Sequence, residues 1–186
     1  MTFIEGAGIK PAVSPVRPVY LMAKPPPDIA QQIAQQRRVL GMDARYPAER
    51  FHITLLPLGA HDALSNGDLA RIDHAVAESR AEPAAILLDR LRGNRLEGIG
   101  MRDVKALQKR LASHLRAAGT RLPEYRFNPH LTLAYGVPPR PPARIAPIGW
   151  HVDEVLLIVS HYGQGRHEIL CRWPLITRQW MLPFAA

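Results

Sequence analysis

The stretch Arg50-Phe51-His52-Ile53-Thr54-Leu55-Leu56-Pro57-Leu58-Gly59 recurs 78 residues later as Asn128-Pro129-His130-Leu131-Thr132-Leu133-Ala134-Tyr135-Gly136. Both copies contain His-x-Thr-Leu and both end in Gly. The chain has 8 His, 5 Thr and 22 Leu among 186 residues, so random placement would give this pattern only about 0.02 times per chain. Two chance copies are not expected, and the repeat is the feature around which the chain is organised.

Each copy of the repeat alternates polar and apolar residues, as a half-buried strand does. Successive side chains of a strand point to opposite faces, so His52 and Thr54 share one face and Ile53 lies on the other. His130 and Thr132 share a face in the same way. The pattern predicts strands over 50–58 and 129–135. If these strands face each other across a cleft, two imidazoles and two hydroxyls converge there.

Such a quartet suits metal-free acid/base chemistry on a phosphate ester. One neutral imidazole can take a proton from water while the other, as imidazolium, gives a proton to the leaving oxygen. A bound phosphate favours the singly protonated pair, because two imidazolium ions repel each other. Thr54 and Thr132 can donate hydrogen bonds to the non-bridging oxygens. The candidate catalytic residues are therefore His52, Thr54, His130 and Thr132, and no cofactor is expected.

A zinc site built on His52 and His130 is the alternative use of the two imidazoles. The sequence contains neither H-E-x-x-H nor paired cysteines at metal-binding spacing. It also lacks the G-x-x-x-x-G-K-[ST] phosphate loop. We therefore expect no metal, and nucleotide hydrolysis of the phosphate-loop kind is not expected.

Composition indicates a globular protein with a basic surface. Hydrophobic residues make up 47% and charged residues 22%, and the net charge is +8 with a sequence pI near 10.2. Cys171 is the only cysteine, so it cannot form an internal disulfide. No apolar run approaches the ~18 residues of a membrane span, and residues 1–10 do not resemble a signal peptide. We expect a soluble, cytoplasmic monomer with no membrane association and no indicated protein partner.

Positive charge gathers in residues 89–126, where ten Arg and Lys stand against four Asp and Glu, a net +6 of the total +8. This segment is a candidate footprint for an RNA backbone. It could equally be the solvated face of the helix predicted there.

Local signals place the remaining elements around the two motif strands. Residues 1–16 are predicted to form a flexible arm, and 17–186 a single domain with two similar lobes that share a central groove. Ser65-Asn66-Gly67-Asp68 resembles a capping box, and the run 137–147 holds five prolines, which predicts an exposed loop. We expect strands over 18–23, 84–91, 95–100, 152–160 and 167–175, and helices over 28–40, 66–82 and 102–118.

The doubled motif resembles the signature of the 2H phosphoesterases, and the chain is similar to their branch of 2'-5' RNA ligases or RNA 2',3'-cyclic phosphodiesterases. The opening Val19-Tyr20-Leu21-Met22-Ala23 and the closing segments 155–160 and 170–175 extend the resemblance over about residues 17–176. It implies a bilobal, duplicated α+β fold in which two antiparallel sheets line a central groove and helices pack outside. It also implies metal-free, ATP-independent opening of a ribose 2',3'-cyclic phosphate to a 2'-phosphate, with reversible 2'-5' RNA ligation in some members. By analogy, His52 would be the acid and His130 the base.

The chain departs from the family pattern at two positions. Several relatives carry Arg where this chain has Tyr135, which implies one fewer phosphate contact unless another arginine replaces it. Relatives often carry Tyr at the position of His167, and Tyr20 is a candidate platform for stacking a base. The candidate substrate-binding residues are therefore Tyr20, Tyr135, Arg50, Arg126, Arg140 and His167.

The leading hypothesis is a phosphodiesterase acting on RNA ends or small cyclic nucleotides. A rival substrate is ADP-ribose 1'',2''-cyclic phosphate. A non-catalytic nucleotide- or RNA-binding module of the same fold is the alternative from another class, and intact His and Thr at all four motif positions argue against it. A third possibility is a basic RNA-binding protein in which the motifs are only structural.

Overall fold

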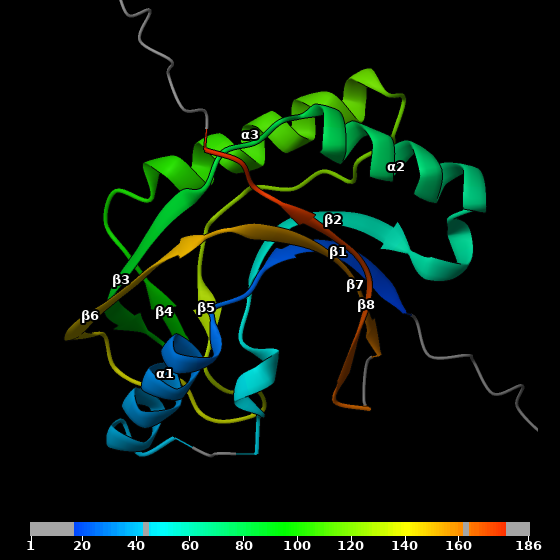
Figure 1. Cartoon of the computed structure of the whole chain (residues 1–186). Coiled ribbons are helices and arrows are strands. Elements are labelled where there is room, and N and C mark those ends of the chain that lie inside the picture. Colours follow the sequence, from blue (N-terminus) through cyan, green and yellow to red (C-terminus); the bar gives the residue numbers. More distant parts are fainter. Residues whose placement is uncertain (1–16, 43–44, 162–163, 178–186) are drawn as a thin grey trace, which may run out of the picture.

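The computed structural model describes residues 17–42, 45–161 and 164–177. Two four-stranded antiparallel sheets dominate these residues (Figure 1). The first has the order β2-β1-β7-β8, with β1 at Pro18–Ala23, β2 at Ile53–Ala60, β7 at Glu154–His161 and β8 at Arg166–Pro174. The second has the order β5-β4-β3-β6, with β3 at Ala84–Arg92, β4 at Arg95–Glu97, β5 at Leu131–Thr132 and β6 at Ala143–Val152. The two motifs thus lie on edge strands of different sheets.

Three α-helices pack against these sheets: α1 at Pro27–Val39, α2 at Asn66–Glu78 and α3 at Arg102–Ala117. Helices α2 and α3 lie together on one side of the molecule, and α1 lies on the opposite side, near β6 (Figure 1). Helix α3 contacts both β3 and β2, so it joins the two sheets. This arrangement confirms the predicted α+β fold with two antiparallel sheets and external helices.

The alternation of β1 separates the main core from the functional side of the first sheet. Val19 and Leu21 are fully buried in the main core. Tyr20 and Met22 point the other way, where Met22 packs with Leu156 and Ile158 in a second, smaller cluster. A period of two in the sequence therefore fixes which side chains of this strand can face a ligand.

The proline-rich segment 137–147 is only partly a loop, so the predicted loop was wrong for its second half. Strand β6 begins at Ala143 and pairs with β3. Two circumstances let it contain Pro147, which cannot donate a backbone hydrogen bond. β6 is an edge strand, and its register with β3 is interrupted between Leu88, which pairs with Ile148, and Arg90, which pairs with Arg144. The strand predicted at 152–160 corresponds to the last residue of β6 together with β7.

Other boundaries move by a few residues. β2 begins at Ile53 and β5 spans only Leu131–Thr132, so each motif histidine immediately precedes its strand instead of lying inside it. β4 ends at Glu97, three residues earlier than predicted. The predicted arm at 1–16 lies outside the described residues.

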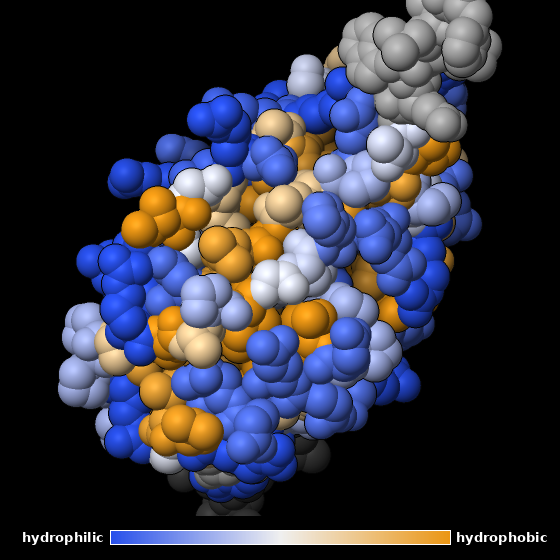
Figure 2. All heavy atoms as spheres, turned by 60° about the vertical axis from the view of Figure 1, so that its left-hand side comes forward, coloured by the Kyte–Doolittle hydropathy of each residue, from blue (hydrophilic) through white to orange (hydrophobic). Residues whose placement is uncertain are grey.

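A hydrophobic band crosses one face of the molecule (Figure 2). On the face shown in Figure 2, hydrophobic residues run down the middle and hydrophilic residues border them. The large hydrophobic side chains that are exposed are Val39, Leu87, Ile99, Tyr135, Leu170 and Ile176. None of the helices within the described ranges is both long enough and apolar enough to span a membrane.

The capping box of α2 provides a test of the fold. The Ser65 hydroxyl accepts from the Asp68 backbone N–H at 3.1 Å, and the Asp68 carboxylate accepts from the Ser65 N–H at 2.8 Å. Ser65→Ala should lower the free energy of unfolding by about 1 kcal/mol, because the helix loses its cap. Urea denaturation checks this. Ser113→Ala, the same change at an exposed site inside α3, should stay within about 0.5 kcal/mol, and equal effects of the two substitutions would contradict the prediction.

Candidate active site

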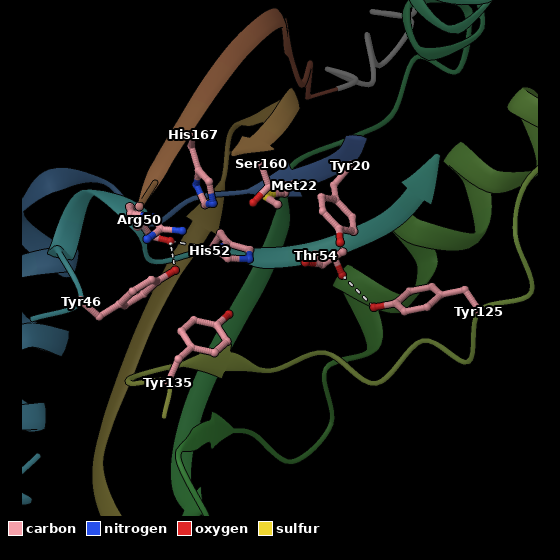
Figure 3. A pocket seen from close by; sticks show the side chains of 11 residues that line it. Tyr20, Met22, Tyr46, Arg50, His52, Thr54, Tyr125, Tyr135, Ser160 and His167 are labelled. Carbon is pink, nitrogen blue, oxygen red and sulfur yellow. Dashed lines mark hydrogen bonds between the residues drawn. The ribbon is translucent and has the colours of Figure 1, made fainter. Parts of the chain in front are cut away.

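The first motif lines a cavity of about 550 Å³ (Figure 3). Phe51, Ile53 and Leu55 are fully buried in the core, and the alternation turns His52 and Thr54 toward the cavity. The strands of the first sheet contribute Tyr20, Met22, Thr54, Ser160 and His167. The lining residues are Tyr20, Met22, Tyr46, Arg50, His52, Thr54, Tyr125, Tyr135, Ser160, Gly165 and His167.

The second motif reaches the site from the other sheet. Leu131 and Leu133 are fully buried, and β5 pairs with β4 through Thr132 and Arg95. His130 lies close enough for its charge to act on His52, although it is not among the residues that line the 550 Å³ cavity. Thr132 lines a smaller adjacent cavity, and Tyr135 belongs to the walls of both.

The two histidines are held by the same local hydrogen bond. His52 Nδ1 lies 2.7 Å from the carbonyl oxygen of Arg50, and His130 Nδ1 lies 2.7 Å from that of Asn128. A carbonyl oxygen only accepts, so each Nδ1 carries a proton and donates it. Each Nε2 is left as the nitrogen that can take up or release a proton. The motif thus sets the tautomer and the orientation of both rings in the same way.

The surroundings of His52 keep its imidazole neutral. Burial lowers the pKa of His52 to about 4, against the opposing effect of the hydrogen bond to the Arg50 carbonyl. The positive charges of Lys24 and Arg50 also lower this pKa. The ring of His167 meets that of His52 edge-on at 5.1 Å between centroids, and burial lowers the pKa of His167 to about 3. Both rings are therefore neutral at pH 7 in the free protein.

Four of the six predicted substrate-binding residues line the cavity: Tyr20, Tyr135, Arg50 and His167. The other two do not. Arg126 is exposed and outside the lining, and the guanidinium of Arg140 donates to the Gly41 carbonyl oxygen at 2.5 Å, near the end of α1. Of the three arginines that could replace the arginine found in relatives, only Arg50 is at the cavity.

Tyr46, Tyr125 and Lys24 were not among the site residues predicted from the sequence. Tyr46 donates to the Arg50 carbonyl oxygen at 2.8 Å, and its ring lies beneath the Arg50 guanidinium at 4.9 Å. Tyr125 donates to the Thr54 carbonyl oxygen at 3.3 Å. Lys24 acts on His52 through its charge, and burial followed by the charge of Arg172 lowers the pKa of Lys24. The two tyrosines lie outside the motifs in segments without a regular period, so no sequence pattern marked them.

Arg37 of α1 holds the two motif segments together. It is 4% exposed, and its Nη1 donates to the carbonyl oxygen of Tyr46, before the first motif, and at 3.4 Å to that of Leu133, within the second. Its guanidinium also lies 5.2 Å from the ring centre of Phe51. Helical spacing places Arg37 on the same face as Ile33. A cation within the apolar stripe of a helix was the sequence feature that could have indicated a buried arginine.

The arrangement can bind an anion and move protons. The lining includes one guanidinium, two imidazoles and hydroxyls of Tyr, Thr and Ser, and none of the described lining residues is acidic. Within the described part of the chain, no group of three or more His, Cys, Asp or Glu side chains could hold a metal ion. A phosphate ester fits this set of donors.

Two antiparallel sheets, each with one His-x-Thr-Leu motif at its edge, are the arrangement of the 2H phosphoesterases. The sequence profile of the 2'-5' RNA ligase superfamily matches residues 25–164, and the chain belongs to this superfamily. No curated protein matches the sequence.

Solved structures share the fold at low sequence identity. E. coli LigT complexed with 3'-AMP has a TM-score of 0.66 and 22% identity, over 87% of this chain and 99% of LigT. A structure described as a phosphoesterase has a TM-score of 0.63 and 22% identity, over 87% and 99% of the two chains. The protein TT0787 of Thermus thermophilus has a TM-score of 0.60 and 19% identity, over 85% and 97%.

Arg37 gives a test of how the site is held. Arg37→Met should lower the free energy of unfolding by about 1–3 kcal/mol, because buried carbonyl oxygens lose their donor. Chemical denaturation measures the change. The neighbouring Arg38 is exposed and its guanidinium donates to Gln35 of the same helix, so Arg38→Met should stay within about 0.5 kcal/mol. A loss for Arg37→Met no larger than that of the control would show that the buried contacts do not hold the motif segments.

Proposed function

We propose that this protein is a metal-independent phosphodiesterase that opens a ribose 2',3'-cyclic phosphate, at an RNA end or in a small nucleotide, to a 2'-phosphate. The observation that carries the proposal is the matched pair of histidines. In each, Nδ1 is hydrogen-bonded to a main-chain carbonyl oxygen at 2.7 Å. This leaves two Nε2 atoms of the same kind for proton transfer. Membership of the superfamily supports a phosphoesterase-type enzyme.

The reaction requires one base and one acid. Nε2 of the neutral histidine takes a proton from water as the water oxygen bonds to phosphorus. The bond between phosphorus and O3' breaks, and the other histidine, as imidazolium, gives its proton to O3'. Thr54, Thr132 and Arg50 donate to the non-bridging oxygens as negative charge builds on them. The same steps, with a ribose hydroxyl of a second RNA end in place of water as the nucleophile, would also break the bond between phosphorus and O3' and join the two ends through a 2'-5' bond.

Family analogy implies that His52 is the acid and His130 the base, but the electrostatics of the free site favour the opposite assignment. His52 is the ring whose pKa is lowered to about 4 by burial and by nearby cations. A ring that is neutral before substrate arrives is suited to accept the proton of water. We therefore assign the base to His52 and the acid to His130.

Nucleotides fit the rest of the cavity. Tyr20, Tyr125, Tyr135 and His167 offer aromatic surface in the cavity that the first histidine motif lines, and such surfaces stack on bases. Structures of E. coli LigT are known with 3'-AMP, ATP and NADP+, which supports a nucleotide as the ligand here. ADP-ribose 1'',2''-cyclic phosphate also carries a cyclic phosphate on two neighbouring ribose oxygens and is the second substrate to test.

Turnover in the presence of a chelator tests the proposal directly. Wild type should open a 2',3'-cyclic mononucleotide in EDTA, and His52→Ala or His130→Ala should lower kcat/KM at least about 100-fold, because each removes an acid or a base. His151→Ala, at an exposed histidine of β6 outside the cavity, should leave kcat/KM unchanged. Activity that EDTA abolishes and zinc restores would rule out the metal-free mechanism. Binding of the nucleotide without turnover would favour a binding module instead.

The lowered pKa of His52 predicts an unusual pH profile. In the free enzyme His52 gains its proton only as pH falls through about 4. An ordinary histidine, with a pKa near 6.5, would already be charged well above that pH. The pair of His52 and His130 therefore does not become doubly protonated until the pH is near 4. The acidic limb of kcat/KM should therefore lie near pH 4. This limb reports the lower pKa of the pair whichever histidine is the base. Initial rates with a cyclic mononucleotide measure it, and an acidic limb centred near pH 6.5 would contradict the prediction.

A further inference from the structure

A second hollow adjoins the catalytic cavity. It has a volume of about 390 Å³, and Tyr125 belongs to the walls of both. One side is formed by α3, through Lys105, Lys109 and Arg116, and the other by Tyr125 and Phe127. A ligand that fills the catalytic cavity can therefore continue past Tyr125 without leaving the protein surface.

The three cations form a stripe along one face of α3. Positions 105, 109 and 116 repeat at helical spacing, and over these 11 steps the helix advances about 16 Å. All three side chains are exposed, and none of the ion pairs found among the described residues involves them. Like charges four residues apart weaken a helix slightly, so the stripe is not explained by the stability of α3.

The opposite wall offers aromatic surface. Tyr125 and Phe127 are half-buried, with ring centres 6.2 Å apart and planes at 50°. No acidic residue is among the described residues that line the hollow. A positively charged groove beside aromatic rings is how proteins bind single-stranded nucleic acid, because the cations follow the phosphates and the rings stack on the bases. An acidic peptide would use the cations but would gain little from the two rings.

We propose that this hollow, the α3 groove, binds the single-stranded body of an RNA whose 3' end, bearing the cyclic phosphate, occupies the catalytic cavity. This inference rests on the proposed function and narrows its substrate from any cyclic nucleotide to the end of an RNA chain. The 5'-ward nucleotides then run past Tyr125 and along Lys105, Lys109 and Arg116. Sequence preference is weak, since these contacts reach phosphates and base faces.

The test removes the stripe and leaves the catalytic cavity intact. A triple variant, Lys105→Gln, Lys109→Gln and Arg116→Gln, is compared with wild type on two substrates: a 2',3'-cyclic mononucleotide and an RNA of about ten nucleotides ending in a 2',3'-cyclic phosphate. For the RNA, kcat/KM should fall about tenfold or more at physiological salt, and for the mononucleotide it should stay the same. The slope of log kcat/KM for the RNA against log salt should become shallower by about 2, because each of the three cations that neutralises a phosphate contributes roughly 0.7 to that slope.

A matched control separates a local effect from a change of net charge. Arg17→Gln, Arg38→Gln and Arg71→Gln together remove three charges from arginines that line neither cavity. This control should keep at least half of the RNA activity at physiological salt. Two results would overturn the proposed role of the α3 groove. One is an equal loss of RNA turnover in the two triple variants. The other is a stripe variant whose ratio of RNA to mononucleotide turnover is unchanged.

If the proposed function is wrong, the wild-type protein will turn over neither the RNA nor the mononucleotide, which distinguishes this outcome from failure of the α3 groove. In that case fluorescence anisotropy of the labelled RNA still tests the groove, because binding does not require chemistry. The stripe variant should bind the RNA about tenfold more weakly than the control variant, and equal affinities would refute the inference.

Discussion

The buried guanidinium of Arg37 is the constraint on which the site depends. A charge taken out of water must be compensated by hydrogen bonds, or its burial is strongly unfavourable. Arg37 has two of its acceptors in segments far apart in sequence, at Tyr46 and Leu133. Losing either hydrogen bond would leave the buried cation less well compensated. The segment before the first motif and the segment of the second motif are therefore kept at a fixed separation. Each motif histidine lies within a few residues of one of these acceptors.

Within each motif the geometry is local and needs no long-range partner. Nδ1 of His52 and of His130 reaches the carbonyl oxygen two residues earlier, at the same distance. The residues that alternate with the polar ones anchor the strands, since Ile53 and Leu131 are fully buried. A short sequence can therefore encode a ring with a set tautomer, and two copies of it give an acid/base pair once the sheets meet. Long-range packing has only to bring the two together.

This division explains what could be predicted from the sequence. Alternation along the chain predicted the faces of both motifs, and a four-residue pattern predicted the Ser65 cap. The resemblance to a family predicted the two-sheet α+β fold. Each of these signals can be read from short stretches of sequence. β6 was partly missed because Pro147 is tolerated only at an edge strand with interrupted register, and pairing partners are not local. The roles of Tyr46, Tyr125 and Arg140 were beyond the sequence for the same reason: which loops close over a cavity depends on distant segments.

The charges of the cavity also explain why it is incomplete without its ligand. Burial and the cations Lys24 and Arg50 resist protonation of His52, yet two-histidine catalysis needs one proton shared between the rings. A phosphate anion reverses the balance: it offsets the cations and stabilises an imidazolium. Binding of the substrate and uptake of the catalytic proton are therefore thermodynamically linked. In the proposed reaction, burial and the cations keep His52 neutral, and the bound anion stabilises the imidazolium that donates the proton.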